Sequence, residues 1–265
     1  MRVPDASQPT KVLLKVSDVS VRFGGIVALD AVSFEVRERE ICGIIGPNGA
    51  GKTTLFNCLS GLYVPNAGSI VLDGQEVIGR PKHQLADLGI GRTFQNVALF
   101  QTMSVLDNVM VGLHRHARSG YFSTALSLPV MRREERAMQD KAQELLAFLD
   151  LTAVANKPVR ELPFGTRKRV ELARALAMEP KILLLDEPAA GLNHAEVDAL
   201  RVLIEGIRDR LHMTVLLVEH HMNLVMRTSD QVVAFDFGRK IADGSPAEVQ
   251  NNPEVIRAYL GVEAA

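Results

Sequence analysis

The residues best suited to chemistry in this sequence form a glycine-rich run at positions 46–53, GPNGAGKT. The run fits the pattern G-x-x-x-x-G-K-[ST], in which backbone N–H groups cradle phosphates and the lysine reaches the β- and γ-phosphates. Glycines let the backbone approach a triphosphate closely, and the positive end of a following helix attracts it. The run predicts a nucleotide site made of Gly46, Pro47, Asn48, Gly49, Ala50, Gly51, Lys52, Thr53 and Thr54. The alternative is a glycine-rich turn with a surface lysine.

A pair of adjacent acids forms the second candidate. The run KILLLDEP at positions 181–188 reads as a buried strand that ends in Asp186 and Glu187. Asp186 is suited to hold Mg²⁺ together with the hydroxyl of Thr53, and Glu187 to polarise an attacking water as a general base. An isolated acid pair is often only the end of a strand, but a phosphate loop in the same chain makes that alternative improbable.

These residues need elements that bring them together. Residues 12–36 alternate apolar and polar, and short apolar runs at 41–45, 69–72, 182–185, 214–218 and 231–235 are typical of strands. Helical patterns lie between them, at 53–62 and 195–211. Alternating strands and helices indicate an α/β fold with a largely parallel sheet covered on both faces.

The middle of the chain differs. Residues 104–177 contain no convincing buried strand, whereas apolar residues repeat at helical spacing over 131–149. The charged run 132–136 is most simply the solvated start of this helix, and residues 120–129 are expected to form a loop. We therefore predict a helical lobe inserted into the α/β core.

Composition excludes several classes of protein. The chain has 265 residues, 47% hydrophobic and 23% charged, with 30 basic and 31 acidic side chains and a formal net charge of −1. Disorder is not expected, and the charge gives no bulk reason to expect nucleic-acid binding. No apolar run approaches a membrane span, and the N-terminus lacks the apolar centre of a signal peptide. Cys42 and Cys58 show no metal or redox spacing and are expected to be core thiols.

Together these motifs resemble the ATP-binding subunits of ABC transporters over nearly the whole chain. The resemblance implies a P-loop NTPase core with an N-terminal antiparallel β region and a helical subdomain at about residues 97–177, all in one domain over 1–265 with residues 1–10 as a flexible tail. It implies that Phe23 stacks on adenine and that Gln95 ligates Mg²⁺ and links the metal site to the helical lobe. Taken alone, Phe23 would be a core aromatic and Gln95 a surface amide.

The family's signature motif, usually LSGGQ, corresponds here to Leu162, Pro163, Phe164, Gly165 and Thr166. In the family this segment opens a helix and caps the γ-phosphate bound to the opposite subunit. Pro163 removes a hydroxyl and an N–H, although proline is tolerated in a first helical turn. The departure leaves open how fast a homodimer would hydrolyse ATP. Arg169 matches the arginine commonly found after the signature in the family, although the basic run 167–169 could equally be a solvated helix face.

Two further motifs match the family. The D-loop corresponds to Ala190, Gly191, Leu192 and Asn193, with asparagine where aspartate is usual. His220, which follows the buried strand 214–218 and Glu219, corresponds to the switch histidine that contacts the γ-phosphate; His221 is the competing choice. A zinc site is not expected from adjacent histidines, and His114 and His116 are interpreted as surface residues of the helical lobe.

A narrower resemblance rests on DEPAAGLN at positions 186–193, the tail 252–261 and the loop 120–123. These segments look like the LivG-type ATPases of branched-chain amino-acid importers. The resemblance implies a motor that depends on ATP and Mg²⁺ and lies at the cytoplasmic face of the membrane. Its implied partners are permease subunits, a second ATP-binding subunit (or a second copy of this chain in isolation) and, indirectly, a periplasmic binding protein. Nucleic acid is not an expected partner. Related ATPases serve urea or amide import or lipopolysaccharide export. A soluble non-transport ABC ATPase, or a structural partner with a silent site, is less favoured.

Overall fold

The computed structural model describes residues 11–93, 98–113 and 129–263. Its first sheet is antiparallel, in the order β2-β1-β4-β5. The long strands β1 (Val12–Phe23) and β2 (Ile26–Arg37) form a hairpin, and β4 (Ala67–Leu72) and β5 (Gln75–Glu76) extend it on the other side of β1. The predicted N-terminal antiparallel β region is therefore confirmed. The apolar run 69–72 belongs to this sheet and not to the parallel one, because only alternate residues of it are buried.

The second sheet has the strand order β10-β9-β3-β8-β7-β6. Three neighbouring strands at its centre are buried at every residue, and these are β3 (Ile41–Ile45), β8 (Thr214–Val218) and β7 (Ile182–Asp186). The flanking strands are β6 (Ile90–Arg92), β9 (Gln231–Asp236) and β10 (Arg239–Gly244), and only β10 pairs antiparallel. Because β3, β7 and β8 run parallel, their carboxyl ends meet at one edge, as in other open α/β sheets that bind ligands.

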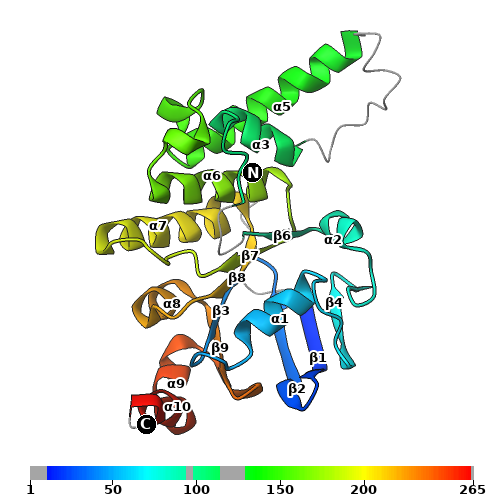
Figure 1. The fold of residues 1–265 in the computed structure, drawn as a ribbon, viewed down its shortest axis with the longest axis vertical. Helices are drawn as coiled ribbons and strands as arrows, with labels where there is room; N and C mark the ends of the chain where they lie inside the picture. The colour runs from blue at the N-terminus through cyan, green and yellow to red at the C-terminus, as the bar shows by residue number, and fades with distance from the viewer. Residues whose placement is uncertain (1–10, 94–97, 114–128, 264–265) are drawn as a thin grey trace.

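Helices surround this sheet (Figure 1). The helix after the glycine-rich run is α1 (Lys52–Leu59), and the others outside the helical lobe are α2 (Lys82–Leu88), α7 (His194–Leu211), α8 (Met222–Thr228), α9 (Pro246–Gln250) and α10 (Pro253–Glu263). The predicted helices at 53–62 and 195–211 correspond to α1 and α7. Among the described residues, no helix combines the length and apolarity needed to cross a bilayer.

A helical lobe lies at the end of the molecule opposite α9 and α10 (Figure 1). It consists of α3 (Val105–Leu113), α5 (Pro129–Phe148), α6 (Phe164–Ala177) and the short 3₁₀ turns Thr152–Val154 and Val159–Glu161. The predicted amphipathic helix corresponds to α5, whose Ala142 and Leu146 are buried in one cluster with Val109 of α3 and Val170 of α6. This cluster continues into Leu183 and Leu185 of β7, so the lobe packs directly on the strand that carries Asp186. The predicted loop at 120–129 lies, except for Pro129, outside the described residues.

Candidate functional site

The glycine-rich run connects the carboxyl end of β3 to the start of α1, as predicted. Gly46 follows the last residue of β3 and has a φ of 151°, and a Cβ built on it would lie 2.3 Å from the carbonyl oxygen of Phe235. Any other residue would therefore displace the loop from β9. Gly51 is the N-cap of α1, and among the described residues no side chain caps this helix. The first-turn N–H groups of α1 are therefore suited to an anion.

Lys52 lies inside the loop rather than on the surface, with only 7% of the residue exposed. Its Nζ donates to the carbonyl oxygens of Gly46, at 2.5 Å, and Pro47, at 2.9 Å. Burial lowers the pKa of Lys52, while the charge of Glu187 raises it. The alternative of a surface lysine on a simple turn is therefore wrong. Lys52 is a buried cation inside the predicted phosphate loop.

Asp186 ends β7, two strands away from β3, and is 7% exposed. Its Oδ2 accepts a hydrogen bond from Nη2 of Arg92 on β6 at 2.8 Å. The hydroxyl of Thr53, an exposed residue in the first turn of α1, is the second predicted Mg²⁺ ligand. Since α1 packs beside β7, the helix that carries Thr53 and the strand that ends in Asp186 are neighbours. Oxygen donors of this kind fit Mg²⁺, which keeps several waters and takes the rest of its shell from substrate phosphates.

Glu187 follows Asp186 in an unusual backbone conformation, with a φ of 47°. Its N–H donates to the carbonyl oxygen of Val218, at the end of the adjacent β8, at 2.9 Å. The loop leaves the sheet through Pro188 and Ala189, and the N–H of Ala189 donates to Oε1 of Glu219 at 2.6 Å. The backbone of the predicted general base and the N–H of Ala189 are therefore hydrogen-bonded to Val218 and Glu219, the two residues that precede His220.

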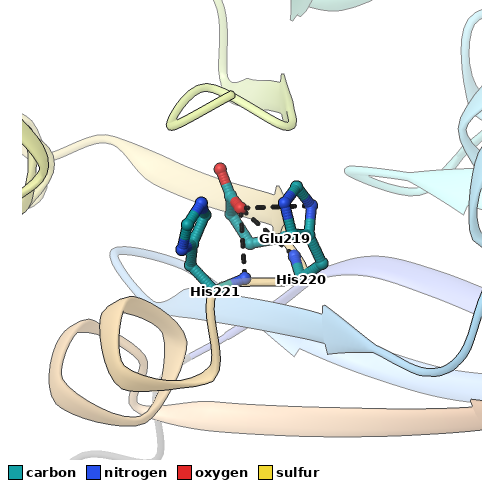
Figure 2. Close-up of side chains that lie close together, drawn as sticks. All are labelled: Glu219, His220 and His221. Carbon is teal, nitrogen blue, oxygen red and sulfur yellow. Dashed lines mark hydrogen bonds and ion pairs between the residues drawn. The ribbon is translucent and has the colours of Figure 1, made fainter. Parts of the chain in front are cut away.

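Figure 2 shows the carboxylate of Glu219 between the imidazole rings of His220 and His221. The Glu219 side chain is fully buried, whereas that of His220 is 52% exposed. Oε2 of Glu219 accepts from the backbone N–H groups of His220, at 3.1 Å, and His221, at 3.4 Å. One potential ligand atom from each residue lies within 4.8 Å of the others. Because the carboxylate already accepts three backbone N–H groups, we interpret it as an anchor for the loop and not as a metal ligand.

The signature segment opens α6, as the resemblance implied. Pro163 is the N-cap residue of α6, Phe164 is its first residue and is 42% exposed, and Leu162 is buried. Gly165 lies against α7, since a Cβ on it would be 2.8 Å from Oε1 of Glu196. Thr166 is half-buried in the first turn.

The basic residues after the signature are not simply a solvated face. Arg167, Lys168 and Arg169 are each half-buried. The charges of Arg167 and Lys168 lie over the ring of Phe164, 5.8 and 5.3 Å from its centroid. Nζ of Lys168 also donates to the carbonyl oxygens of Glu187, at 3.3 Å, and Pro188, at 2.9 Å. No role was assigned from sequence to Lys168, Arg92 or Glu219. The one feature of the sequence that could have drawn attention to them is that each lies beside a recognised motif.

The D-loop segment Ala190, Gly191, Leu192 and Asn193 leads from Glu187 into α7. Asn193 caps α7, because its side chain accepts from the N–H of Glu196 at 3.1 Å while the Glu196 carboxylate accepts from the N–H of Asn193 at 2.9 Å. This reciprocal pair is a capping box, so Asn193 stabilises the start of α7 whatever else it contacts.

Phe23 ends β1 and is 46% exposed, so the alternative of a core aromatic is wrong. It meets the edge of Tyr63, with 5.2 Å between ring centroids, and Tyr63 was not singled out from sequence. An exposed aromatic is available for stacking, but its contact with adenine stays a prediction. Gln95, His114 and His116 lie outside the described residues.

Comparison with known proteins agrees with this geometry. Residues 29–190 match the ABC transporter family, and residues 239–265 match a family described as branched-chain amino acid ATP-binding cassette transporter. The high-affinity branched-chain amino acid transport ATP-binding protein BraF of Pseudomonas aeruginosa is 46% identical over 94% of this chain and 98% of its own length. Its counterpart LivG of Escherichia coli K12 is 45% identical over 96% and 99%.

Among solved structures, the ADP conformation of MJ1267, an ATP-binding cassette of an ABC transporter, superimposes with a TM-score of 0.82 at 30% identity. The match covers 95% of this chain and all of that one. The recognised family and the P-loop NTPase fold are thus confirmed. The chain belongs to the ABC transporter family, as one of its ATP-binding subunits.

Proposed function

We propose that this chain is the ATP-hydrolysing motor subunit of an importer for branched-chain amino acids. The observation that carries the proposal is the convergence of Lys52, the acid pair Asp186–Glu187 and His220 at the carboxyl ends of three adjacent strands, β3, β7 and β8. The proposed substrate rests on relatives whose names specify branched-chain amino acid transport over almost the whole chain.

In this mechanism the phosphates of ATP lie on the first-turn N–H groups of α1 and on Lys52. Thr53, Asp186 and Gln95 would hold Mg²⁺, which when bound neutralises charge on the β- and γ-phosphates. Glu187 orients a water and accepts its proton as the water oxygen bonds to the γ-phosphorus and the bond to the β-γ bridging oxygen breaks. His220 contacts the γ-phosphate from the end of β8, and Phe23 stacks on adenine.

Transport requires that this reaction move a permease. A second ATP-binding subunit presents its signature segment to the γ-phosphate held here, and this chain's segment 162–166 does the same in return. Closure around ATP draws the helical subdomains, here at about residues 97–177, and the attached permeases together at the cytoplasmic face of the membrane. Hydrolysis removes the γ-phosphate contacts, so the helical subdomains and permeases separate again. The dimer therefore has two states, and the bound nucleotide decides which one is favoured.

The variant Glu187→Gln tests the proposed chemistry. It keeps the shape of the side chain but cannot accept the proton, so ATP binding should persist while turnover falls by at least about a hundredfold. Glu35→Gln, an exposed residue of β2 paired with Lys15, is the matched control and should hydrolyse ATP normally. Wild-type turnover in Glu187→Gln would remove Glu187 from its proposed role.

Reconstitution with the candidate permeases, second ATPase and binding protein tests the proposed substrate. Leucine, isoleucine or valine should stimulate ATP turnover in proteoliposomes. Stimulation by urea or an amide instead would assign the chain to one of the related importers.

A further inference from the structure

Two charged side chains outside the recognised motifs hold the short segment that carries Glu187. From α6, Nζ of Lys168 donates to the carbonyl oxygens of Glu187 and Pro188. From the end of β8, the buried carboxylate of Glu219 accepts from the N–H of Ala189. The cation of Lys168 therefore binds two carbonyl oxygens of this segment, and the carboxylate of Glu219 binds the N–H of Ala189. Each charge faces the end of the peptide dipole that has the opposite sign.

The segment needs such support because its backbone is strained. Glu187 has a φ of 47°, in the left-handed region that residues other than glycine rarely occupy. Its own N–H is bonded to Val218, and the next two peptide groups are the ones that Lys168 and Glu219 contact. Loss of either contact would let the backbone relax toward a commoner conformation and carry the carboxylate away from the attacking water.

Lys168 is well placed for this task. It lies two residues after the signature segment, in the first turns of α6, and it is half-buried. Burial lowers the pKa of Lys168 below its ordinary value, and the carboxylates of Glu219, Glu171 and Glu187 oppose this shift. Its contact with the ring of Phe164 ties it to the start of the same helix.

We propose that Lys168 is a positioning residue that couples the signature helix to Glu187 of the same chain, with Glu219, the residue directly after β8, as its fixed counterpart. The inference rests on the proposed role of Glu187. In the proposed function the signature segment contacts the nucleotide of the opposite subunit, so a displacement of α6 there would be transmitted through Lys168 to the base of this chain's own site. Occupancy of one site thereby adjusts hydrolysis at the other.

The test uses the reconstituted transporter with Lys168→Met, which keeps the length of the side chain and removes its charge and its N–H donors. We expect kcat to fall about tenfold or more, because loss of the charge-assisted hydrogen bonds to this segment would move Glu187 away from the attacking water, with KM for ATP changed by less than about twofold. Lys168→Arg, which retains a cation and donors, should recover most of kcat. Lys141→Met, a half-exposed lysine of α5 in the same lobe, is the matched control and should behave as wild type.

Glu187→Gln is measured in parallel, so that the two ideas can fail separately. Wild-type kcat in Lys168→Met beside an inactive Glu187→Gln would overturn the coupling role alone. A fall in kcat accompanied by an equal loss of ATP affinity would also overturn it. The same holds if Lys168→Arg is as impaired as Lys168→Met, because either result would mean that Lys168 only stabilises the local structure. If Lys168→Met does not fold, Glu219→Gln, read by the same split between kcat and KM, decides the question.

Discussion

Nη2 of Arg92 and Oδ2 of Asp186 form an ion pair 2.8 Å long in which both side chains are only 8% exposed. The same guanidinium donates to the carbonyl oxygen of Phe56 and to the side chains of Asn57 and Ser60, all in or directly after α1. The carboxylate proposed to bind Mg²⁺ is therefore oriented by a cation that also fixes the helix following the phosphate loop.

Arg92→Gln should destabilise the protein by about 3–5 kcal/mol, because it leaves the buried carboxylate of Asp186 without its cation. Urea denaturation measures the loss. Arg239→Gln is the control, since Arg239 pairs with Asp30 at the surface with 72% of its side chain exposed. That pair should contribute no more than about 1 kcal/mol. Equal losses in the two variants would contradict the structural importance of the Arg92 pair.

Lys52→Ala should weaken ATP binding by at least about tenfold, because a charge-assisted contact of about 1.5–3 kcal/mol with the phosphates is removed. Calorimetric titration with Mg²⁺ and ATP measures the change. Lys240→Ala removes a lysine that pairs with Asp243 on β10 and should bind ATP as wild type does. Unchanged affinity in Lys52→Ala would rule out the phosphate-cradle interpretation of the loop.

Gly49→Ala should separate folding from nucleotide binding. A Cβ at Gly49 meets nothing within 4 Å in the described part of the chain, and its φ of 80° adds a backbone cost of only about 1–2 kcal/mol. The variant should therefore fold but bind ATP poorly, because the methyl group occupies space that the phosphates need. Gly46→Ala, whose Cβ would meet backbone at 2.3 Å, should lose more stability in urea. Tight ATP binding by Gly49→Ala would show that the phosphates lie elsewhere.

Asn193→Ala should lower stability by about 0.5–2 kcal/mol, because it removes the N-cap of α7. Asn193→Asp, which restores the aspartate usual in the family, keeps an acceptor for the N–H of Glu196 and places a negative charge at the positive end of the helix. Thermal unfolding should therefore show a lower midpoint for alanine and an unchanged or higher midpoint for aspartate. Equal losses in both variants would contradict a capping role.

The elements that were predicted correctly are those with strong local patterns. The fully apolar runs that became β3, β7 and β8 could be identified because strands buried on both faces have no polar alternation. Residues 69–72 were correctly predicted to form a strand, but so short a run does not reveal which strand it pairs with, and it lies in the antiparallel sheet. The three-residue strand β6 was not predicted, since so short a segment has no period to detect.

The phosphate loop, the acid pair and the individual helices of the lobe could be predicted from local patterns, because each depends on residue types close together along the chain. Which charges meet could not be predicted in this way. Arg92 and Asp186 are 94 residues apart, and Glu219 contacts Ala189 across 30. Such contacts are fixed by strand order and by the packing of α6 on the sheet, and these follow from burial summed over the whole core rather than from any local pattern.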